Sequence, residues 1–292
     1  MEIYDPIEEQ YNRIQSSKKQ EVQKKKVAFD KKNYLSTKLE SNETEKKITV
    51  RILNLTPDSQ TPFEIIQMHY LPSKKTSYVC AKHTENLPDG VERNCPFCDL
   101  RDEAKEAQKG ASEIEWNKLK EIYKQNGTMA NYIVRLVDRD DQSFGIKFWK
   151  FSEPIFKMIY NLYKDNKEDD INIFDYLKGK DLVITIEKQK GKSKITGITA
   201  KNKQSPLAET EEERNKLITD EKTWNDVYSV KPYGYLELLI EGKEPFFDKE
   251  KGEWVENKKK KNDDTESSYE EEYLGEIAAE ENQETEKDEL PF

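Results

Sequence analysis

The residues of this chain that are best suited to chemistry are its cysteines and histidines. All three cysteines and both histidines fall between positions 69 and 98: His69, Cys80, His83, Cys95 and Cys98. Two residues separate Cys95 from Cys98, a knuckle spacing that places two thiolates on adjacent vertices of a tetrahedron. Cys80 and one histidine would complete a closed four-coordinate site that leaves no position for water. The pattern therefore predicts one structural Zn²⁺ and no catalytic metal.

The spacing leaves the fourth ligand open between two histidines. Cys80 and His83 form a compact local knuckle, whereas His69 would connect a predicted strand to the cysteine loop. Spacing alone slightly favours His83. The alternatives to zinc are unrelated buried cysteines or a redox Cys-x-x-Cys motif. A redox motif opens a helix in a βαβ context, and the pattern around Cys95 does not have that context.

A second feature is the aromatic and basic segment 144–151, which alternation predicts to be a strand. Aromatic rings stack on bases while lysines meet phosphates, so a strand that carries Trp149 beside Lys147 suits single-stranded nucleic acid. A large hydrophobic core is the alternative for these aromatic residues. The residues assigned to a nucleic-acid surface on this and neighbouring strands are Arg51, Tyr132, Arg135, Lys147, Trp149, Lys150 and Phe151.

Four further cations follow a later apolar run, namely Lys188, Lys190, Lys192 and Lys194 around Gly191. If a hairpin continues through this segment, alternation places all four lysines on one face. Such a face beside a groove would track a phosphate backbone. A solvated turn is the alternative.

The charge of the chain is divided unevenly between a body and a tail. Residues 262–292 contain 13 acidic residues and one lysine, whereas the whole chain has a net charge of −10, so residues 1–261 carry a net +2. With 37% charged and 34% hydrophobic residues, part of the chain is not expected to pack. No apolar run approaches the roughly 18 residues that span a bilayer, and no secretory signal opens the chain. We therefore expect neither a membrane protein nor a secreted one.

The body is predicted to be mainly β with peripheral helices. Strands are expected at 48–53, 63–70, 132–137, 144–151, 182–187 and 194–200, and helices at 102–125, from Pro154 onward, and at 209–241. Short strands in hairpins suggest a small closed or partly open barrel. The predicted divisions are a basic N-terminal arm at 1–45, a core at 46–255 with a zinc subdomain at about 63–125, and a disordered acidic tail at 256–292.

Both ends of the chain carry interaction signals. The N-terminal arm has Ile3, Ile7, Tyr11 and Ile14 at helical spacing, followed by a lysine-rich stretch at 18–32. The arm is predicted to serve self-association, with docking of the apolar stripe on the chain's own body as the alternative. The tail ends in an acidic and apolar tip that would enter a basic-rimmed apolar pocket on a partner protein, while the acidic tail competes with DNA. The tip residues are Asp288, Glu289, Leu290, Pro291 and Phe292.

With these residues in view, the chain resembles the single-stranded DNA-binding proteins of T-even and related phages. The resemblance follows an ordered series of features across roughly residues 20–200: the basic arm, residues 50–53, residues 62–63 and 69–70, Cys80, the 95–98 knuckle and the 147–151 strand. The family implies an OB-fold barrel with an inserted zinc subdomain. It also implies cooperative, sequence-independent coating of single strands during DNA replication, recombination and repair, in the cytoplasm of an infected bacterial host.

The resemblance also assigns individual residues. In the family, the fourth zinc ligand is a histidine on a strand upstream of the first cysteine, and His69 matches that position. The implied ligands are therefore His69, Cys80, Cys95 and Cys98, with His83 as the alternative. Trp149 matches an aromatic position of the family's DNA cleft. The tail tip is similar to that of bacterial single-strand binders, which implies that replication and recombination proteins bind there.

We therefore expect a single-stranded DNA-binding protein that is not an enzyme. A rival interpretation is a zinc-finger adaptor or transcription regulator that binds a protein or duplex DNA. A nuclease that uses Asp138, Asp140 and Asp141 is a weaker one, because these carboxylates fall in a predicted turn with no companion base.

Overall fold

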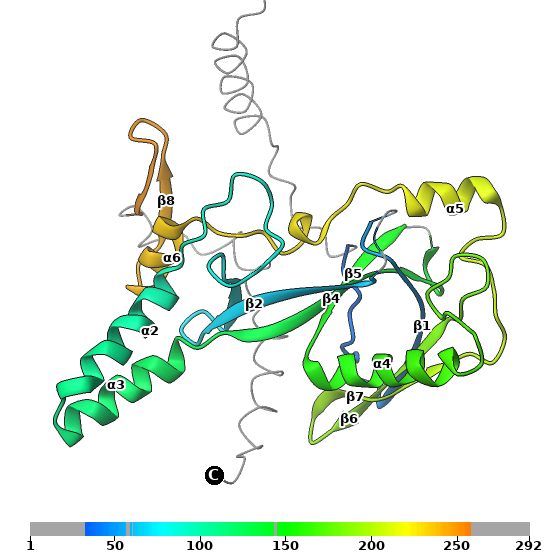
Figure 1. Ribbon diagram of the computed structural model, residues 1–292, viewed down its shortest axis with the longest axis horizontal. Coiled ribbons are helices and arrows are strands. Elements are labelled where there is room, and N and C mark those ends of the chain that lie inside the picture. Colours follow the sequence, from blue (N-terminus) through cyan, green and yellow to red (C-terminus); the bar gives the residue numbers. More distant parts are fainter. Residues whose placement is uncertain (1–32, 57–58, 60, 143–144, 258–292) are drawn as a thin grey trace, which may run out of the picture. The chain divides into compact units, whose positions relative to one another are not determined.

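The computed structural model describes residues 33–257 except 57–58, 60 and 143–144 (Figure 1). These residues belong to one compact unit that begins at Lys32. The predicted lysines at 18–32, the acidic tail and its tip lie outside the described residues. Within the described part, no helix is both long enough and apolar enough to cross a membrane.

The centre of the molecule is a seven-stranded sheet in which all strand pairs are antiparallel. Its strands are β1 (Glu45–Leu53), β2 (Phe63–Leu71), β3 (Thr76–Val79), β4 (Met129–Asp138), β5 (Ile146–Phe151), β6 (Leu182–Gln189) and β7 (Lys192–Ala200). The order is β3-β2-β4-β1-β6-β7, and β5 pairs with β4. A separate hairpin contains β8 (Pro245–Asp248) and β9 (Glu253–Glu256). The mainly β class predicted from the sequence is confirmed.

The described helices are α2 (Pro96–Ala107), α3 (Glu113–Gln125), α4 (Glu153–Lys167), α5 (Glu211–Ile218) and α6 (Tyr233–Ile240). Figure 1 shows α2 and α3 side by side at one end of the long β2–β4 pair, with α4 beside the other strands. The α2–α3 hairpin, the cysteine loop before it, β3 and α6 form a second module, which we call the zinc module. The strands β1, β4, β5, β6 and β7 with α4 form what we call the barrel.

The barrel curves around an apolar core because β1 changes partner along its length. Residues 45–50 of β1 pair with β6 and residues 50–53 pair with β4, and Val50 takes part in both pairings. The side chains beneath this bend are aliphatic and aromatic, and Ile159 of α4 packs against them. No strand ladder joins β5 to β7 in the described residues, so a closed OB-fold barrel is not confirmed.

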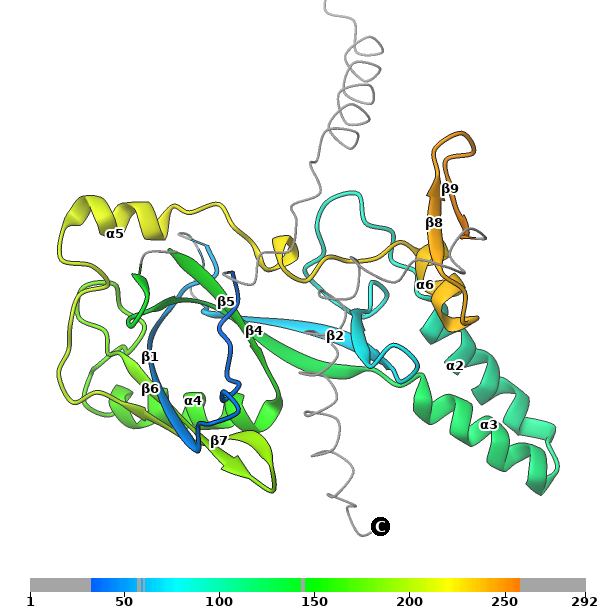
Figure 2. The same cartoon turned by 180° about the vertical axis from the view of Figure 1, so that it is seen from behind.

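The segment before β1 crosses the open side of the barrel (Figure 2). The amide of Leu35 donates to the carbonyl of Phe148 in β5 at 3.0 Å. The amide of Leu39 donates to the hydroxyl of Ser193 in β7 at 2.9 Å. Leu35 is buried in the same core as the strands. The chain thus covers the gap with a single extended segment rather than with a hydrogen-bonded ladder.

The single helix predicted at 102–125 is wrong, because two helices occupy this region. A 3-10 turn at Gln108–Gly110 separates them, and Ser112 begins α3 with a capping box in which its hydroxyl and the Glu115 side chain exchange backbone bonds. A capping box provides hydrogen-bond acceptors for backbone amides at the N-terminus of a helix, which have no partner within the helix. The helical prediction for 209–241 holds only for α5, a 3-10 turn at Trp224–Asp226, and α6. The strands β3, β8 and β9 were not predicted.

The lysine hairpin also differs from the expectation. Lys190 and Gly191 have φ angles of 51° and 83°. Positive φ at both central residues is typical of a two-residue type I′ turn, which joins the two strands. This short turn pairs Lys188 with Ser193 and Glu187 with Lys194. Residues directly opposite one another share a face, so Lys188 and Lys194 lie on opposite faces. The prediction that all four lysines share one face is therefore wrong.

Candidate metal centre and nucleic-acid interface

The structure gathers His69 and the three cysteines into one fully buried cluster. The four ligand atoms all lie within 4.8 Å of one another. The Cys80 and Cys98 sulfurs are 3.5 Å apart, and the Cys98 sulfur lies 3.4 Å from Nε2 of His69. A tetrahedral zinc with Zn–S of about 2.3 Å and Zn–N of about 2.0 Å holds its ligands roughly 3.5–3.8 Å apart. The donor set and its spacing are therefore compatible with a structural zinc site.

The four candidate ligands come from three elements. His69 comes from β2 and Cys80 follows β3, while Cys95 caps α2 and Cys98 lies in its first turn. Proline at position 96 suits the first helical turn because it has no amide hydrogen to leave unpaired. The positive end of the α2 dipole then lies beside the sulfurs and favours thiolates. Hydrogen bonds with Cys95 and Cys98 lower the pKa of the Cys80 thiol, and hydrogen bonds with Cys80 and Cys95 raise that of Cys98.

The histidine is held in the orientation that a metal requires. Its Nδ1 lies 3.1 Å from the carbonyl of Gly127, which follows α3, so Nδ1–H donates there and Nε2 faces the sulfurs. The ring of His69 stacks on Phe97 with 4.8 Å between centroids and 12° between planes. His83 is exposed and is not in the cluster. The structure thus selects His69, the position implied by the family resemblance, over the spacing preference for His83.

The predicted phosphate contact Arg51 is instead buried within the barrel. Its Nε donates to Asp181 at 2.9 Å, and its Nη2 donates to the carbonyl and hydroxyl of Ser205. Burial lowers the pKa of this guanidinium. Asp181 also accepts from Arg139 at 3.0 Å. One carboxylate thus joins two arginines, and Arg51 has no surface left for a phosphate in this conformation.

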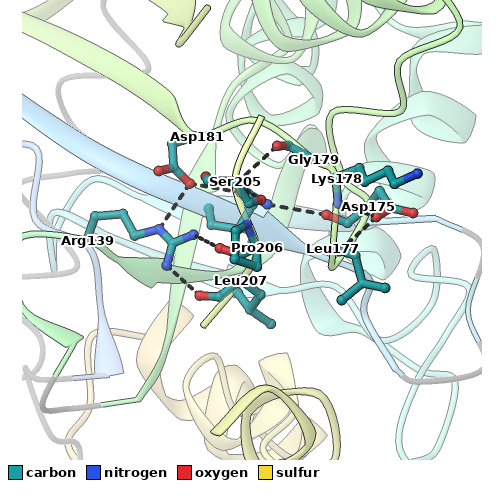
Figure 3. A network of polar contacts seen from close by, with 10 residues as sticks. Arg139, Asp175, Leu177, Lys178, Gly179, Asp181, Ser205, Pro206 and Leu207 are labelled. Carbon is teal, nitrogen blue, oxygen red and sulfur yellow. Dashed lines mark hydrogen bonds and ion pairs between the residues drawn. The ribbon is translucent and has the colours of Figure 1, made fainter. Parts of the chain in front are cut away.

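Figure 3 shows how this network fixes the loop that follows β7. Arg139 donates to the carbonyls of Pro206 and Leu207 as well as to Asp181. The same loop is held from the other side, because the amide of Ser205 donates to the carbonyl of Gly179. The arginines therefore act as internal clamps between the loop and the strands.

The other predicted cationic contacts on β4 and β5 are also buried. Arg135 donates to the carbonyls of Leu55, Leu217 and Asp220. Lys147 pairs with Asp138 at 2.8 Å. Lys150 lies 3.9 Å from the sulfur of Met68, and its ammonium is 5.9 Å from the ring centroid of Tyr228. These contacts correct the phosphate roles predicted for Arg135, Lys147 and Lys150, because the protein itself solvates each cation.

Trp149 and Phe151 form part of the apolar core of the barrel, with at most 3% of either side chain exposed. A base has no access to these rings in this conformation, so their predicted role in stacking is corrected to core packing. Alternation failed as a guide here because both faces of β5 are buried. One face meets the barrel core, and the other lies under the chain near Tyr34, whose hydroxyl donates to the carbonyl of Val227 at 2.7 Å.

The carboxylates considered for a nuclease are engaged by neighbouring groups. Asp138 pairs with Lys147, and Asp140 accepts from the backbone amide of Thr49 at 3.2 Å. Asp141 lies 3.6 Å from the same lysine. Asp140 thus links the β4–β5 connection to β1, and Asp138 and Asp141 pair with Lys147 of β5, so structural roles explain all three.

Among the aromatic residues predicted to bind DNA, Tyr132 is the one whose ring connects the buried core to exposed rings. Its ring is near-parallel to that of Phe151, with centroids 6.2 Å apart and planes at 8°, and to that of Phe156, at 4.3 Å and 12°. Phe156 is followed by Tyr160 at 6.1 Å and 20°. The four near-parallel rings, which we call the aromatic column, run from the buried core to a Tyr160 side chain that is 49% exposed.

The sequence analysis did not identify Phe156 and Tyr160. Both lie on α4 four residues apart, a spacing that puts side chains above one another on one helix face. Lys164 continues the same stripe by another four residues and is exposed. The i, i+4 aromatic spacing was the signal that could have found them. Beside the column, Ile65 of β2 pairs with Tyr132 of β4 and is 47% exposed.

The remaining predicted cations lie on the β6–β7 hairpin. Lys188, Lys190, Lys192 and Lys194 are exposed, with Lys190 in the turn and the others on the strand ends next to it. The hairpin belongs to the barrel, because α4 packs on β7. The aromatic column and these lysines are therefore carried by the same part of the molecule.

The comparisons with known proteins can be stated against this geometry. A family model described as gp32 DNA binding protein like matches residues 44–234, which is more than half of the chain. The chain belongs to this family. The predicted resemblance to single-stranded DNA-binding proteins of the T-even type is thereby confirmed, and the family is one of DNA-binding proteins rather than of enzymes. A search among curated proteins found no match.

Proposed function

We propose that this chain coats single-stranded DNA without sequence preference, and that bases stack on the exposed end of the aromatic column. Membership in a DNA-binding family supports the substrate class. The observation that carries the site is the half-exposed ring of Tyr160 at the end of four near-parallel rings. Strands and α4 already order these rings, so a base that stacks there pays little to immobilise them. Every base has a π face, and stacking therefore reads no sequence.

The hairpin lysines are the proposed phosphate contacts. They are exposed cations on the barrel, and the body of the chain carries a net +2 once the tail is set aside. Neutralising phosphates releases condensed counterions, so binding weakens as salt rises. The buried arginines and lysines of β1, β4 and β5 have no part in this proposal.

The finer roles are also proposals. We assign the protein to phage DNA replication, recombination and repair in the cytoplasm of a bacterial host, with partner proteins bound by the tail tip. The 13 acidic residues of the tail would compete with DNA for the hairpin lysines. Truncation before Asn262 is expected to tighten DNA binding and to abolish partner binding. Equal DNA affinity of the intact and truncated chains would contradict the competition.

The test is equilibrium binding of labelled oligo(dT) and of a duplex of equal length, followed by fluorescence anisotropy. Wild-type protein is expected to prefer the single strand. Tyr160→Ala removes the outer ring and is expected to cost about 1–3 kcal/mol, roughly a 5- to 150-fold loss of affinity. Phe247→Ala is the matched control, because that ring is 42% exposed but lies on β8, outside the column.

The possible outcomes test the stacking site and the DNA-binding function separately. A single-strand preference with equal losses in the two variants would keep the function and overturn the stacking site. A preference for duplex DNA, or no DNA binding by either the full chain or a chain truncated before Asn262, would overturn the function. The latter results would favour an adaptor or transcription regulator.

A further inference from the structure

The hairpin of β8 and β9 lies outside the residues that the family model matches, which end at 234. It forms a two-stranded sheet of its own, and such a hairpin is only marginally stable in water unless other elements cover it. Helix α6 covers one face. The Trp254 ring meets Tyr235 of α6 edge-to-face with 4.9 Å between centroids, and Phe247 packs beside Trp254 at 5.3 Å. Figure 1 shows β8 next to α6.

The opposite face of the hairpin is open to solvent within the described residues. Residues directly opposite one another share a face, so Phe246 and Val255 lie on the side away from Trp254. Asp248 and Glu253 form another pair on that same side, toward the turn. Phe246 is 53% exposed, and Glu253 is also exposed. We call Phe246, Val255, Asp248 and Glu253 the outer hairpin face.

The charge around this face is negative. Residues 241–256 contain six acidic residues and three lysines, a net charge of −3. Three of the acids have lysine partners, whereas in the part of the chain that the structure describes the other three have none: Glu250, Glu253 and Glu256. Carboxylates without a partner repel phosphates and attract ammonium and guanidinium groups. This charge therefore favours a basic protein segment over nucleic acid as the ligand.

The outer edge of β9 offers backbone groups to such a segment. The amide of Asn257 donates to the carbonyl of Glu244 at 2.8 Å, and hydrogen-bonded pairs alternate along an antiparallel ladder. The amides and carbonyls of Trp254 and Glu256 therefore point away from β8, and no third strand pairs with β9 among the described residues. The edge of β8 is less suitable because Pro245 has no amide hydrogen to donate. An extended peptide can thus add to the sheet beside β9.

We propose that the β9 edge and the outer hairpin face bind an extended, lysine- or arginine-rich segment of another protein as a third strand. An apolar side chain of the segment packs on Val255 beside the Phe246 ring, and a neighbouring cation pairs with Glu253. The ring also attracts cations through its π face. In such strand addition the backbone bonds give affinity and alternate side chains give specificity. Basic segments of this kind are typical of proteins that bind nucleic acid, which makes such a protein the fitting partner.

The first test uses the full chain without DNA and a fluorescein-labelled peptide that alternates lysine and valine, with binding followed by anisotropy at low salt. Glu253→Lys is expected to weaken peptide binding about fivefold or more. Glu121→Lys makes the same change of net charge at an exposed position on α3 and is the control, with an affinity within about twofold of wild type. Equal losses in the two variants would show attraction by net charge alone and would overturn the proposal.

The apolar contact is tested with the same peptide. Phe246→Ser is expected to weaken binding about fivefold or more. Ile114→Ser removes a side chain of α3 that is 73% exposed and is the control, with unchanged binding. Hydrogen exchange of β8 and β9 equal to that of wild type establishes that the hairpin is folded in each free variant, and Glu253→Lys decides the test if Phe246→Ser raises that exchange. Unweakened binding by Phe246→Ser would overturn the proposal.

Strand addition is tested by hydrogen exchange of the wild-type chain with and without saturating peptide, resolved to single amides. The amides of Trp254 and Glu256 are expected to become protected, because they point away from β8. A peptide that alternates glutamate and valine is the control and is expected not to bind. Absence of protection at both amides, or equal binding of the acidic peptide, would overturn the proposal.

The chain's own lysine-rich segments at 18–32 and 258–261 lie outside the described residues and are the competing occupants. They are tested with p-benzoylphenylalanine at position 246 of the full chain. Photocrosslinks to the added lysine–valine peptide are expected. Crosslinks to either lysine-rich segment that persist in the presence of the peptide would overturn the proposal. None of these readouts depends on DNA binding, so the DNA proposal stands or falls separately.

Discussion

The barrel and the zinc module are stabilised in different ways, although both contain buried strands and helices. Among the described residues, fifteen buried side chains form the barrel core, and all of them are aliphatic or aromatic. The buried core of the zinc module consists of Tyr78, Cys80, Cys95, Phe97, Cys98, Leu236 and Leu239. Three of these seven are candidate metal ligands. The barrel core is thus built by apolar packing alone, whereas much of the module's small core consists of residues that a bound metal would hold together.

The comparison also explains how α6 is held. Leu236 and Leu239 of α6 pack against the cysteine cluster, and the ring of Tyr235 meets Trp254 of β9 edge-to-face at 4.9 Å. The last described elements of the chain are thus attached to the module through the residues that surround the metal site. A change at the cluster should therefore spread to α6 and the β8–β9 hairpin but not to the barrel.

The largest expected effect is that of metal removal. Structural zinc contributes about 10–16 kcal/mol of apparent binding free energy in zinc-finger peptides, so its loss should unfold the module. Chelation, or Cys95→Ala, is expected to raise hydrogen exchange in α2, α3, α6 and β9. Exchange in β1, β6 and β7 should stay low. Equal hydrogen exchange with and without metal throughout the zinc module would contradict the claim that the module, unlike the barrel, depends on a metal.

The next effect concerns the barrel alone. Asp181→Ala leaves Arg51 and Arg139 without their shared carboxylate, and removing one partner from a buried ion pair costs about 3–5 kcal/mol. Urea unfolding is expected to show this loss, with unchanged zinc affinity. Asp169→Ala, at an exposed position after α4, is the control and should leave stability within about 0.5 kcal/mol of wild type. A loss in the control as large as in Asp181→Ala would contradict the account.

The smallest effect is on the salt dependence of DNA binding. Each phosphate contact on a single strand contributes about 0.7 to the slope of log affinity against log salt. Lys192→Gln and Lys194→Gln together are expected to lower the magnitude of that slope by up to about 1.4. Zinc content and barrel stability should not change. A slope equal to that of wild type would remove these two hairpin lysines from the interface.

Much of this architecture could be predicted from the sequence because the relevant signals are local. The 95–98 knuckle predicted the cluster of candidate metal ligands, and alternation predicted β1, β4 and β6. Local signals could not choose between His69 and His83, because the choice depends on how β2 meets the cysteine loop. They also could not show that β5 is covered on both faces. That cover comes from Tyr34 and Tyr228, which are far from β5 in sequence. Their rings pack edge-to-face with 5.3 Å between centroids.

The burial of the aromatic and basic strand residues was predicted least well, for the same physical reason. Strand alternation separates two faces but does not say which of them faces solvent, so Trp149 and Phe151 were assigned to DNA although they fill the core. The surface ring came from α4, where Phe156 and Tyr160 sit one helical turn apart. Tyr132 links the strand and the helix, because its ring is near-parallel to those of both Phe151 and Phe156.

The most direct test of the central claim is photocrosslinking of 5-iodouracil oligonucleotides to the full chain, with the modified residues identified by mass spectrometry. Halogenated bases crosslink to the aromatic rings on which they stack. The account predicts crosslinks at Tyr160, with weaker ones at Tyr132 or Phe156, and competition by unlabelled oligo(dT) but not by duplex. Crosslinks confined to rings outside the aromatic column, such as Trp116, Phe247 or Trp254, would contradict it.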